Sequence, residues 1–417
     1  MSPSQGHFNA FNDVWLLDGL RTPLVDYCGA LADVSPTDLG IKVAREVLAR
    51  SGIAPAQVDS VLTGSMAPGD FDQFFLPRHI GLYAGVPQHV PALMVQRICG
   101  TGFELFRQAG EQLSHGTASL ALVVGTESMS RNPIMAFDHR QGFKLGAPLG
   151  FKDHLWEMLY DPAAGITMIQ TAENLATQYG ITREEVDAFA SQSFARAVAA
   201  QESGFLAGEI VPVVSEKFEL AGYKSRGIRL AAKHAVADRD THPRLSPPEV
   251  LAKLRAIYPD GVQTGGNSSG LTDGAAAALL AGGALARDWG RAPLARVLAT
   301  AVVGVPPETM GIGPAPAIRL LLQRVGLTLT DIAFVEVNEA QGAQTLAVQR
   351  ELALDPAKLN VNGGAIALGH PLAASGVRLA ITAARQLQHA GQRYAVASAC
   401  IGGGQGIALL LENPAAI

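Results

Sequence analysis

The stretch TGFELFRQAGEQLSHGTASLA, residues 101–121, recurs later in the chain as SGVRLAITAARQLQHAGQRYA, residues 375–395. The two stretches align without gaps at an offset of 274 residues (375 minus 101), and seven of their 21 positions are identical. The identical pairs are Gly102/Gly376, Leu105/Leu379, Ala109/Ala383, Gln112/Gln386, Leu113/Leu387, His115/His389 and Ala121/Ala395. Similarity at a fixed offset is typical of structurally equivalent units.

The same offset relates a second pair of stretches with no adjustment. Its identical pairs are Arg45/Arg319, Leu48/Leu322, Arg50/Arg324, Gly52/Gly326 and Val61/Val335. Two separate stretches in one register predict that the chain consists of two equivalent halves. Chance similarity between alanine- and leucine-rich helices is the alternative, but it does not account for the shared glycines and histidines.

Each half shows helical and strand patterns in alternation. Ser35 begins a stretch with helical spacing of apolar residues, and Gly52 is placed to end it. The short apolar runs 121–125 and 394–399 are typical of buried strands. Helices between such strands predict largely parallel sheets in an α/β fold with helical layers.

The chain between the halves has no counterpart at the 274-residue offset. It contains a loop-like segment, a predicted helix over 184–203 and a polar stretch rich in Lys, Arg and His. We therefore predict three parts. They are an N-terminal half formed by 11–130 plus 261–285, an inserted loop domain over 131–260, and a C-terminal half over 286–417.

Composition excludes several classes of protein. A net charge of −5 with scattered basic residues argues against a nucleic-acid binder. No window reaches the ~18 uncharged apolar residues of a membrane-spanning helix, and the opening lacks the pattern of a secretory signal. We therefore expect a soluble cytoplasmic protein that binds neither membrane nor nucleic acid. The three cysteines are too few and too scattered for a disulfide framework or a four-ligand zinc site, so no metal is predicted.

Two segments before the repeat helices carry reactive side chains. Cys99 in VQRICGTG stands just before a predicted helix, whose unpaired N–H groups favour a thiolate. His370 in NVNGGAIALGHPLAASG is surrounded by glycines, which allow the backbone to approach a ligand closely. The alternatives are a buried structural cysteine and a core histidine. The duplication places these two turns at equivalent positions, so they could converge on one site.

Two further strand ends carry polar groups. Cys400 follows a predicted buried strand in ASACIGGGQG, and the Asn338–Glu339 pair ends the strand IAFVEV. Such ends are where parallel-sheet enzymes place functional groups. The alternative for Asn338 and Glu339 is that they only cap the following helix.

Together these segments resemble the thiolase family. The resemblance rests on VQRICGTG, NEAQGAQ, NVNGGAIALGHPLAASG and CIGGGQG, with GGNSSGLTDGAAAALL, MGIGPAPA, GTESMS and TAENLA as further matches. It extends from about residue 14 to residue 411. It implies a five-layer αβαβα fold of two duplicated halves with an inserted loop domain, which agrees with the duplication.

The resemblance also implies roles for particular residues. Cys99 would be the nucleophile, activated by proton transfer to His370. Cys400 would be the acid/base that protonates the leaving enolate in cleavage, or removes the α-proton of the second acyl-CoA in synthesis. Asn338, through a water, would form one oxyanion hole with His370. The backbone N–H groups of Cys99 and Gly402 would form the other. A thioester carbonyl and a weakly acidic α-proton require such a set.

Contacts to coenzyme A (CoA) follow from the same resemblance. Ser269 matches a serine near the pantetheine arm, and Met168 matches a methionine of the acyl pocket. Cations of the inserted segment could hold the CoA phosphates, and the candidates are Lys224, Arg226, Lys233, Arg239 and Arg244; they could equally be ordinary solvated charges. Gln341 and Thr167 replace an aromatic residue and a histidine of short-chain thiolases, which leaves the acyl chain open.

The expected activity is that of an acyltransferase in fatty acid metabolism. It would cleave or form a 3-oxoacyl-CoA reversibly through an acyl-cysteine intermediate in ping-pong fashion. CoA and acyl-CoA would be substrates, with no permanently bound cofactor, and the family implies a homodimer or homotetramer with contacts in 131–160. The alternatives are a decarboxylating 3-oxoacyl synthase, against which Cys400 argues, and a non-catalytic acyl-CoA-binding subunit.

Overall fold

The computed structural model describes residues 6–231 and 233–416. The first five residues, which belong to the opening tested for a secretory signal, lie outside the described residues. So do residue 232 of the predicted inserted domain and residue 417 of the predicted C-terminal half.

The 274-residue offset relates secondary-structure elements of the two halves. Strand β6 (Leu120–Glu127) and strand β18 (Tyr394–Ile401) begin and end at equivalent positions. Helices α1 (Pro36–Ser51) and α9 (Pro314–Val325) end at equivalent residues. Each helix is followed by a glycine in the left-handed conformation, with φ of 70° at Gly52 and 75° at Gly326. The predicted helices and buried strands are confirmed.

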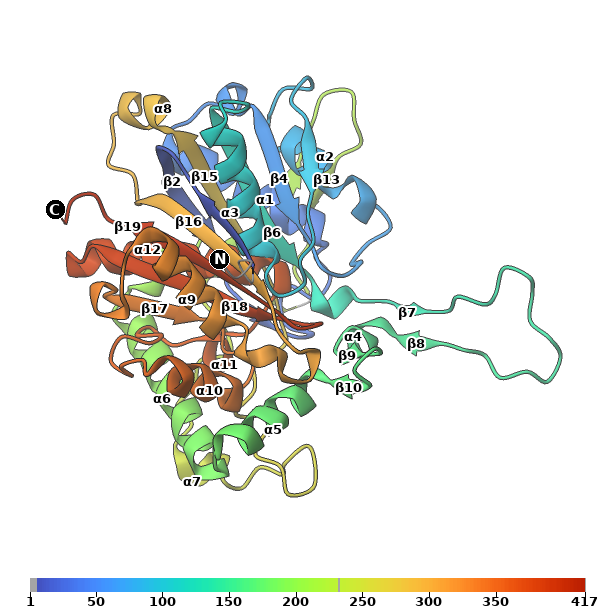
Figure 1. Cartoon of the computed structure of the whole chain (residues 1–417). Coiled ribbons are helices and arrows are strands. Elements are labelled where there is room, and N and C mark those ends of the chain that lie inside the picture. The colour runs from blue at the N-terminus through green and yellow to red at the C-terminus, as the bar shows by residue number, and fades with distance from the viewer. Residues whose placement is uncertain (1–5, 232, 417) are drawn as a thin grey trace.

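The strands of the two halves lie in corresponding orders in the large sheet, except that β5 has no counterpart in the C-terminal half (Figure 1). In the N-terminal half the order is β5 (Ala92–Met94), β4 (Ser60–Gly64), β6, β15 (Thr272–Gly282) and β2 (Val14–Arg21). In the C-terminal half it is β17 (Phe334–Val337), β18, β19 (Gln405–Glu412) and β16 (Ala295–Gly304). The two sheets join where β2 and β16 pair over two residues each. The strand β1 (His7–Ala10) pairs with β16.

The prediction of largely parallel sheets is wrong. Only the pairs β4–β5, β4–β6 and β17–β18 are parallel, and the remaining pairs of the large sheet are antiparallel. The reason is local for β18 and β19, because a turn over 402–404 joins them directly. A parallel pair would need a crossover connection instead.

The centre of the molecule is the contact between helices α3 (Thr101–Ser114) and α12 (Leu372–Ala390). A Cβ atom added at Gly102 would lie 2.5 Å from the backbone nitrogen of Val377, and one at Gly376 would lie 2.5 Å from that of Phe103. Glycine is therefore required on both helices, because the two backbones touch. Gly102 and Gly376, which are equivalent in the repeat, therefore lie against each other at the centre of the two halves.

Three buried clusters define the layers. One lies between the N-terminal sheet and the outer helices α1 and α2 (Leu76–Tyr83), and a second surrounds α3 and α12 between the two sheets. A third lies between the C-terminal sheet and the outer helices, which include α9 and α10 (Gly342–Leu352). The five-layer α/β fold is thus confirmed.

The segment after β6 leaves the layered body. The strands β7 (Ile134–Met135) and β8 (Lys152–Asp153) pair at the base of a long hairpin that projects from the molecule (Figure 1). The helices α5 (Met168–Tyr179) and α6 (Arg183–Glu202) then pack against α10, and α6 confirms the helix predicted over 184–203. The remaining helices and strands of this segment are α4 (His154–Glu157), β9 (Tyr160–Asp161), β10 (Ile166–Thr167), β11 (Val213–Val214), β12 (Glu216–Phe218), β13 (Arg226–Ile228), β14 (Val236–Ala237) and α7 (Pro248–Leu251).

We expect Gly102→Ala to lower the free energy of unfolding by about 1–3 kcal/mol or more, because the added Cβ overpacks a backbone contact. Chemical denaturation measures the change. The control is Gly265→Ala, at an exposed glycine with nothing within 4 Å of an added Cβ. Equal stability of the two variants would contradict the close helix contact.

Candidate active site

The Cys99 loop is held immediately before α3. The hydroxyl of Thr101 donates to the carbonyl of Ile98 at 2.7 Å and accepts the N–H of Arg97 at 2.8 Å. Nη1 of Arg97 also donates to Oε1 of Gln405 at 2.8 Å. Because Gln405 begins β19, this bond ties the Cys99 loop to the turn that follows Cys400.

His370 is buried and oriented from both sides of its ring. Its Nδ1 lies 2.6 Å from the hydroxyl oxygen of Ser375, and its Nε2 lies 3.3 Å from Nδ2 of Asn338. The Ser375 hydroxyl also lies within donor distance of the Pro371 carbonyl, at 3.2 Å. If the hydroxyl donates there, Nδ1–H donates to Ser375, and Nε2 keeps its lone pair. Burial, with Arg378 nearby, lowers the His370 pKa to about 3, so the ring is neutral.

Asn338 and Cys400 lie on adjacent chain segments. Asn338 follows β17, and its backbone N–H donates to the carbonyl of Ser398 on β18 at 2.9 Å. Its side-chain Oδ1 is buried and has no hydrogen-bond partner among the described residues. Cys400 is fully buried, and burial together with the charge of Cys99 raises its thiol pKa. Neither Asn338 nor Glu339 caps α10 through a side chain, since Gln341 occupies the N-cap position.

A cavity of about 210 Å³ opens at Cys99. Its lining residues come from both halves and from the inserted segment: Met66, Ile98, Cys99, Met158, Leu159, Tyr160, Asp161, Pro162, Met168, Leu372, Gly402 and Gly403. Met168 also packs against Cys400. The structure thus brings Cys99 and Cys400 into one region, although they lie far apart in the sequence. The His370–Asn338 pair adjoins this region, because Leu372 lines the cavity two residues after His370 and Asn338 bonds to Ser398, two residues before Cys400.

The expected lowering of the Cys99 pKa by the helix terminus is wrong for the free protein. Burial raises the pKa of this thiol to about 11. Hydrogen bonds from the backbone N–H groups of Gly402 and of Cys99 itself lower it, but they do not offset the loss of solvation. These two donors therefore face the sulfur atom, where negative charge would develop on an attached acyl group.

Ser269 lies in a loop that contacts both catalytic loops. Its N–H donates to the carbonyl of Ala340 at 3.0 Å, and the carbonyl of the next residue, Gly270, accepts the N–H of His370 at 2.9 Å. Arg244 is exposed and lies over the ring of Phe194, and it does not line the Cys99 cavity.

The two unusual positions differ in their contacts within the chain. Thr167 caps α5 and shares a hydrogen bond of 2.7 Å with the hydroxyl of Tyr258. Gln341 is buried, and its Oε1 has no hydrogen-bond partner among the residues that the structure describes. Of the cations considered for CoA, Arg226 is already paired with Asp38 and Asp72.

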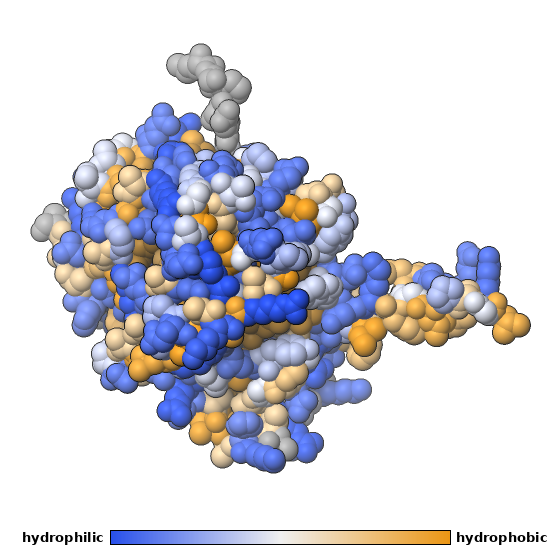
Figure 2. All heavy atoms as spheres, turned by 90° about the horizontal axis from the view of Figure 1, so that it is seen from below, coloured by the Kyte–Doolittle hydropathy of each residue, from blue (hydrophilic) through white to orange (hydrophobic). Residues whose placement is uncertain are grey.

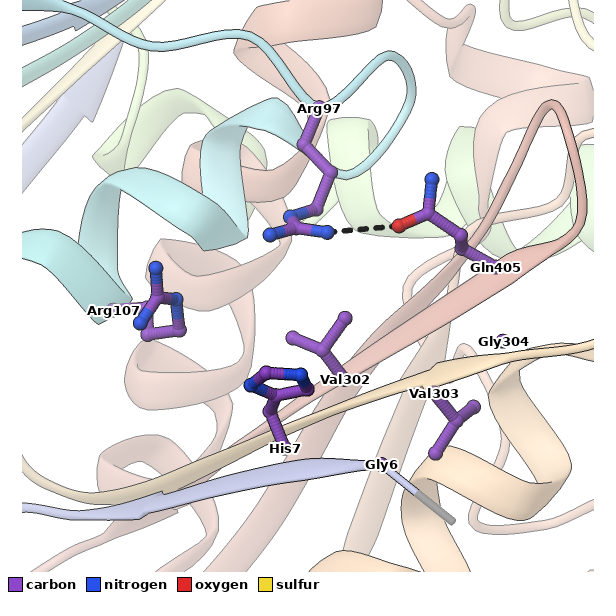
Figure 3. Close-up of a pocket in the computed structure, with 8 residues that line it drawn as sticks. All are labelled: Gly6, His7, Arg97, Arg107, Val302, Val303, Gly304 and Gln405. Atoms are coloured by element: carbon purple, nitrogen blue, oxygen red, sulfur yellow. Dashed lines mark hydrogen bonds between the residues drawn. The ribbon is translucent and has the colours of Figure 1, made fainter.

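A different, open cavity of about 520 Å³ lies beside the Cys99 loop (Figure 3). It is lined by Gly6, His7, Arg97, Arg107, Val302, Val303, Gly304 and Gln405. Glu104 pairs with both Arg97 and Arg107, and Glu111 pairs with Arg107. The two positive charges are thus matched by two carboxylates, and no cysteine, serine or threonine is among the described residues that line the cavity.

Comparisons with known proteins agree with this geometry. The family model "Thiolase, N-terminal domain" matches residues 14–283, and "Thiolase, C-terminal domain" matches residues 291–413. The chain belongs to the thiolase family.

Relatives cover nearly the whole chain of this thiolase. The mitochondrial 3-ketoacyl-CoA thiolase of Bos taurus is 41% identical over 96% of this chain and 98% of its own length. The beta-ketoadipyl-CoA thiolase of Acinetobacter baylyi is 40% identical over 96% and 99%. The crystal structure of human mitochondrial 3-ketoacyl-CoA thiolase in complex with CoA has a TM-score of 0.90 at 40% identity, covering 96% of this chain and 98% of that one.

Two features are absent from the described part of this thiolase. No group of three or more His, Cys, Asp or Glu side chains there could hold a metal ion. No helix there is long and apolar enough to cross a membrane.

Sequence reasoning missed several residues of the site. The 274-residue offset aligns Ser375 with Thr101, but it does not by itself indicate that the Ser375 hydroxyl contacts the ring of His370. Met66 and Met158 line the thiolase cavity but lie in segments with no recognised pattern. The only sequence signal for the contact with the ring was a serine five residues after His370.

We expect Ser375→Ala to lower kcat about tenfold with little change in KM, because the imidazole loses the partner that fixes its orientation. Steady-state kinetics of 3-oxoacyl-CoA cleavage measures both. Ser51→Ala, which removes a buried hydroxyl bonded to Leu48 in α1, serves as the control. A similar kcat for both variants would show that Ser375 does not orient His370.

Proposed function

We propose that this protein catalyses the reversible, CoA-dependent cleavage of a 3-oxoacyl-CoA, with Cys99 as the nucleophile. One observation carries the proposal most directly. The Cys99 sulfur accepts hydrogen bonds from the backbone N–H groups of Cys99 and Gly402, and Cys99 lines a cavity together with Met168, which packs against the cluster that contains Cys400. This is the arrangement needed to bind an acyl group and stabilise its oxyanion.

The first half of the reaction transfers an acyl group to sulfur. His370, neutral because of its burial, takes the thiol proton of Cys99 at Nε2. The sulfur attacks the 3-oxo carbon, the bond between C2 and C3 breaks, and the electron pair passes to the enolate of acetyl-CoA. Cys400 then donates its proton to that enolate carbon. The raised pKa of the Cys400 thiol keeps this proton in place until the enolate forms.

The second half returns the acyl group to CoA. The thiol of a second CoA gives its proton to the Cys400 thiolate, and its sulfur attacks the acyl-cysteine carbonyl. Cys99 leaves as the thiolate and takes back its proton from His370. The two N–H groups of Cys99 and Gly402 stabilise the tetrahedral oxyanion. The unpaired Oδ1 of Asn338 and its Nδ2 contact with His370 support a second polar site, where a water could be bound for the enolate oxygen. No permanently bound cofactor is required by these steps.

The walls of the cavity favour an apolar acyl chain. Met66, Met158 and Met168 surround the thiol together with aliphatic residues, and methionine adapts to chains of different shape. The names of relatives agree with a 3-oxoacyl-CoA substrate, since they include 3-ketoacyl-CoA and beta-ketoadipyl-CoA thiolases.

We assign CoA binding and subunit contacts to residues 131–260, inserted between the predicted halves 11–130 plus 261–285 and 286–417. Exposed Arg244 remains the candidate for a phosphate of CoA, whereas the ion pairs of Arg226 with Asp38 and Asp72 argue against Arg226. Ser269 contributes through its loop, which contacts the loops of Asn338 and His370.

Exposed apolar side chains on the projecting hairpin support a homodimer or homotetramer. The projecting hairpin of 134–153 presents apolar side chains over much of its length (Figure 2), and the exposed ones are Ile134, Phe137, Phe143, Leu145, Leu149 and Phe151. A contiguous exposed apolar surface of this kind marks an interaction site. A cytoplasmic location stays a prediction, because the mammalian relatives are named mitochondrial.

We expect Cys99→Ser to reduce CoA-dependent loss of a 3-oxoacyl-CoA by ~10³-fold or more, because the nucleophile is lost. Absorbance of the substrate measures turnover across acyl chains of increasing length. Cys28→Ser is the matched control, since Cys28 is exposed and lies outside the site.

The proposal fails if the unmodified protein cleaves no 3-oxoacyl-CoA of any chain length, which would indicate a non-catalytic subunit. Release of CO₂ from malonyl-CoA during condensation would instead indicate a decarboxylating synthase.

A further inference from the structure

Glu127 is a buried carboxylate that the proposed reaction does not use. It stands at the end of β6 and is fully buried. Its oxygens accept the N–H groups of Met66 at 2.9 Å, Ala67 at 3.1 Å and Ala373 at 3.2 Å. The hydroxyl of Ser65 lies 3.4 Å away. Four donors therefore converge on one carboxylate in the absence of any cation among them.

These donors belong to the two walls of the Cys99 cavity. Met66 lines one side of the cavity, and Leu372, the residue before Ala373, lines another. Both residues also pack in the apolar cluster that contains Cys99. Glu127 therefore connects the wall from the N-terminal half with the wall from the C-terminal half.

The link to Ala373 also replaces a missing helix cap. Helix α12 begins just after His370, and its N-cap residue Pro371 makes no side-chain cap hydrogen bond. The carboxylate of Glu127 accepts an N–H of the first turn and lies at the positive end of the helix dipole. Strand and helix are in close contact there, because a Cβ added at Gly125 would lie 2.2 Å from the carbonyl oxygen of Ala373.

The charge of Glu127 acts on the nucleophile. Burial raises the pKa of Glu127 to about 7, so the carboxylate is ionised in mildly alkaline solution. After burial, the charge of Glu127 is the other influence that raises the pKa of the Cys99 thiol. Among the described residues, the other titratable groups near Cys99 are Cys400, Tyr160 and Asp161, and His370 lies two residues before cavity-lining Leu372.

We infer that Glu127 is a positioning residue for the thiolase reaction. It fixes the separation of the Met66 and Leu372 walls beside Cys99, and its negative charge opposes formation of the Cys99 thiolate. The inference rests on the proposed function for its effect on turnover. The effect of the Glu127 charge on the Cys99 thiol does not depend on turnover.

Two variants separate the effect of the side-chain length of Glu127 from the effect of its charge. Glu127→Asp keeps the charge but is one methylene shorter, so it cannot bind both walls. We expect kcat to fall about ten- to a hundredfold with a KM change below about threefold, because the reacting groups are misplaced. Glu127→Gln removes the charge, so we expect alkylation of Cys99 by iodoacetamide near pH 8.5 to become about three- to tenfold faster. Mapping of the alkylated peptide separates Cys99 from exposed Cys28.

Glu412→Gln is the control for a general loss of stability. Glu412 is a buried carboxylate that pairs with Arg296 and Arg393 at the end of β19, away from the cavity. The Glu412→Gln variant should have a lower melting temperature, because two ion pairs are lost, but an unchanged kcat and an unchanged alkylation rate of Cys99.

A folded Glu127→Asp variant with the kcat of the unmodified protein would overturn the positioning role. An alkylation rate in Glu127→Gln equal to that of the unmodified protein would overturn the effect of the charge. If Glu127→Gln does not fold, Glu127→Asp still decides the positioning role. If the unmodified protein shows no turnover, the proposed function fails, while the alkylation rates still decide the role of the charge.

Discussion

The direct backbone contact between α3 and α12 is the constraint on which the rest of the structure depends. Glycine at positions 102 and 376 lets the two helices approach until any side chain would collide with the opposite backbone. This contact places the first turns of both helices side by side at the centre of the five layers. The loops that precede those turns carry Cys99 and His370, so the packing of the core also brings the reactive groups together.

Equivalent hydroxyls stabilise the two loops in related ways. Thr101 bonds to the carbonyl of Ile98, and its repeat counterpart Ser375 bonds to the carbonyl of Pro371. The halves then diverge in chemistry. Thr101 only supports the nucleophile loop, whereas Ser375 also contacts the ring of His370. Duplication thus supplied one scaffold on which two different reactive groups stand at corresponding places.

Burial dominates the electrostatics of the site. It raises the pKa of both cysteine thiols and of Glu127, and it lowers that of His370, so every one of these groups is shifted toward its neutral form. The two thiols and the imidazole are therefore neutral in the free protein, whereas Glu127, with a pKa of about 7, carries a charge in mildly alkaline solution. In the proposed reaction the thiol and the imidazole become charged only when the thiol proton moves to His370, and the N–H groups of Cys99 and Gly402 already lie at the sulfur atom.

The sequence by itself determined the two-half organisation, the bounds of the repeat elements within a few residues, and the loops that carry Cys99, His370, Cys400 and Asn338. It did so because repeat register, helix ends and glycine-rich turns are properties of short segments. The tertiary structure alone decided the direction of the strands, the pKa of Cys99 and the part played by Glu127. The donors to Glu127 lie up to 246 residues away in the chain, and the solvation of a thiol depends on everything packed around it. The residues next to Glu127 and Cys99 in the sequence therefore reveal neither the hydrogen-bond donors of Glu127 nor the pKa of Cys99.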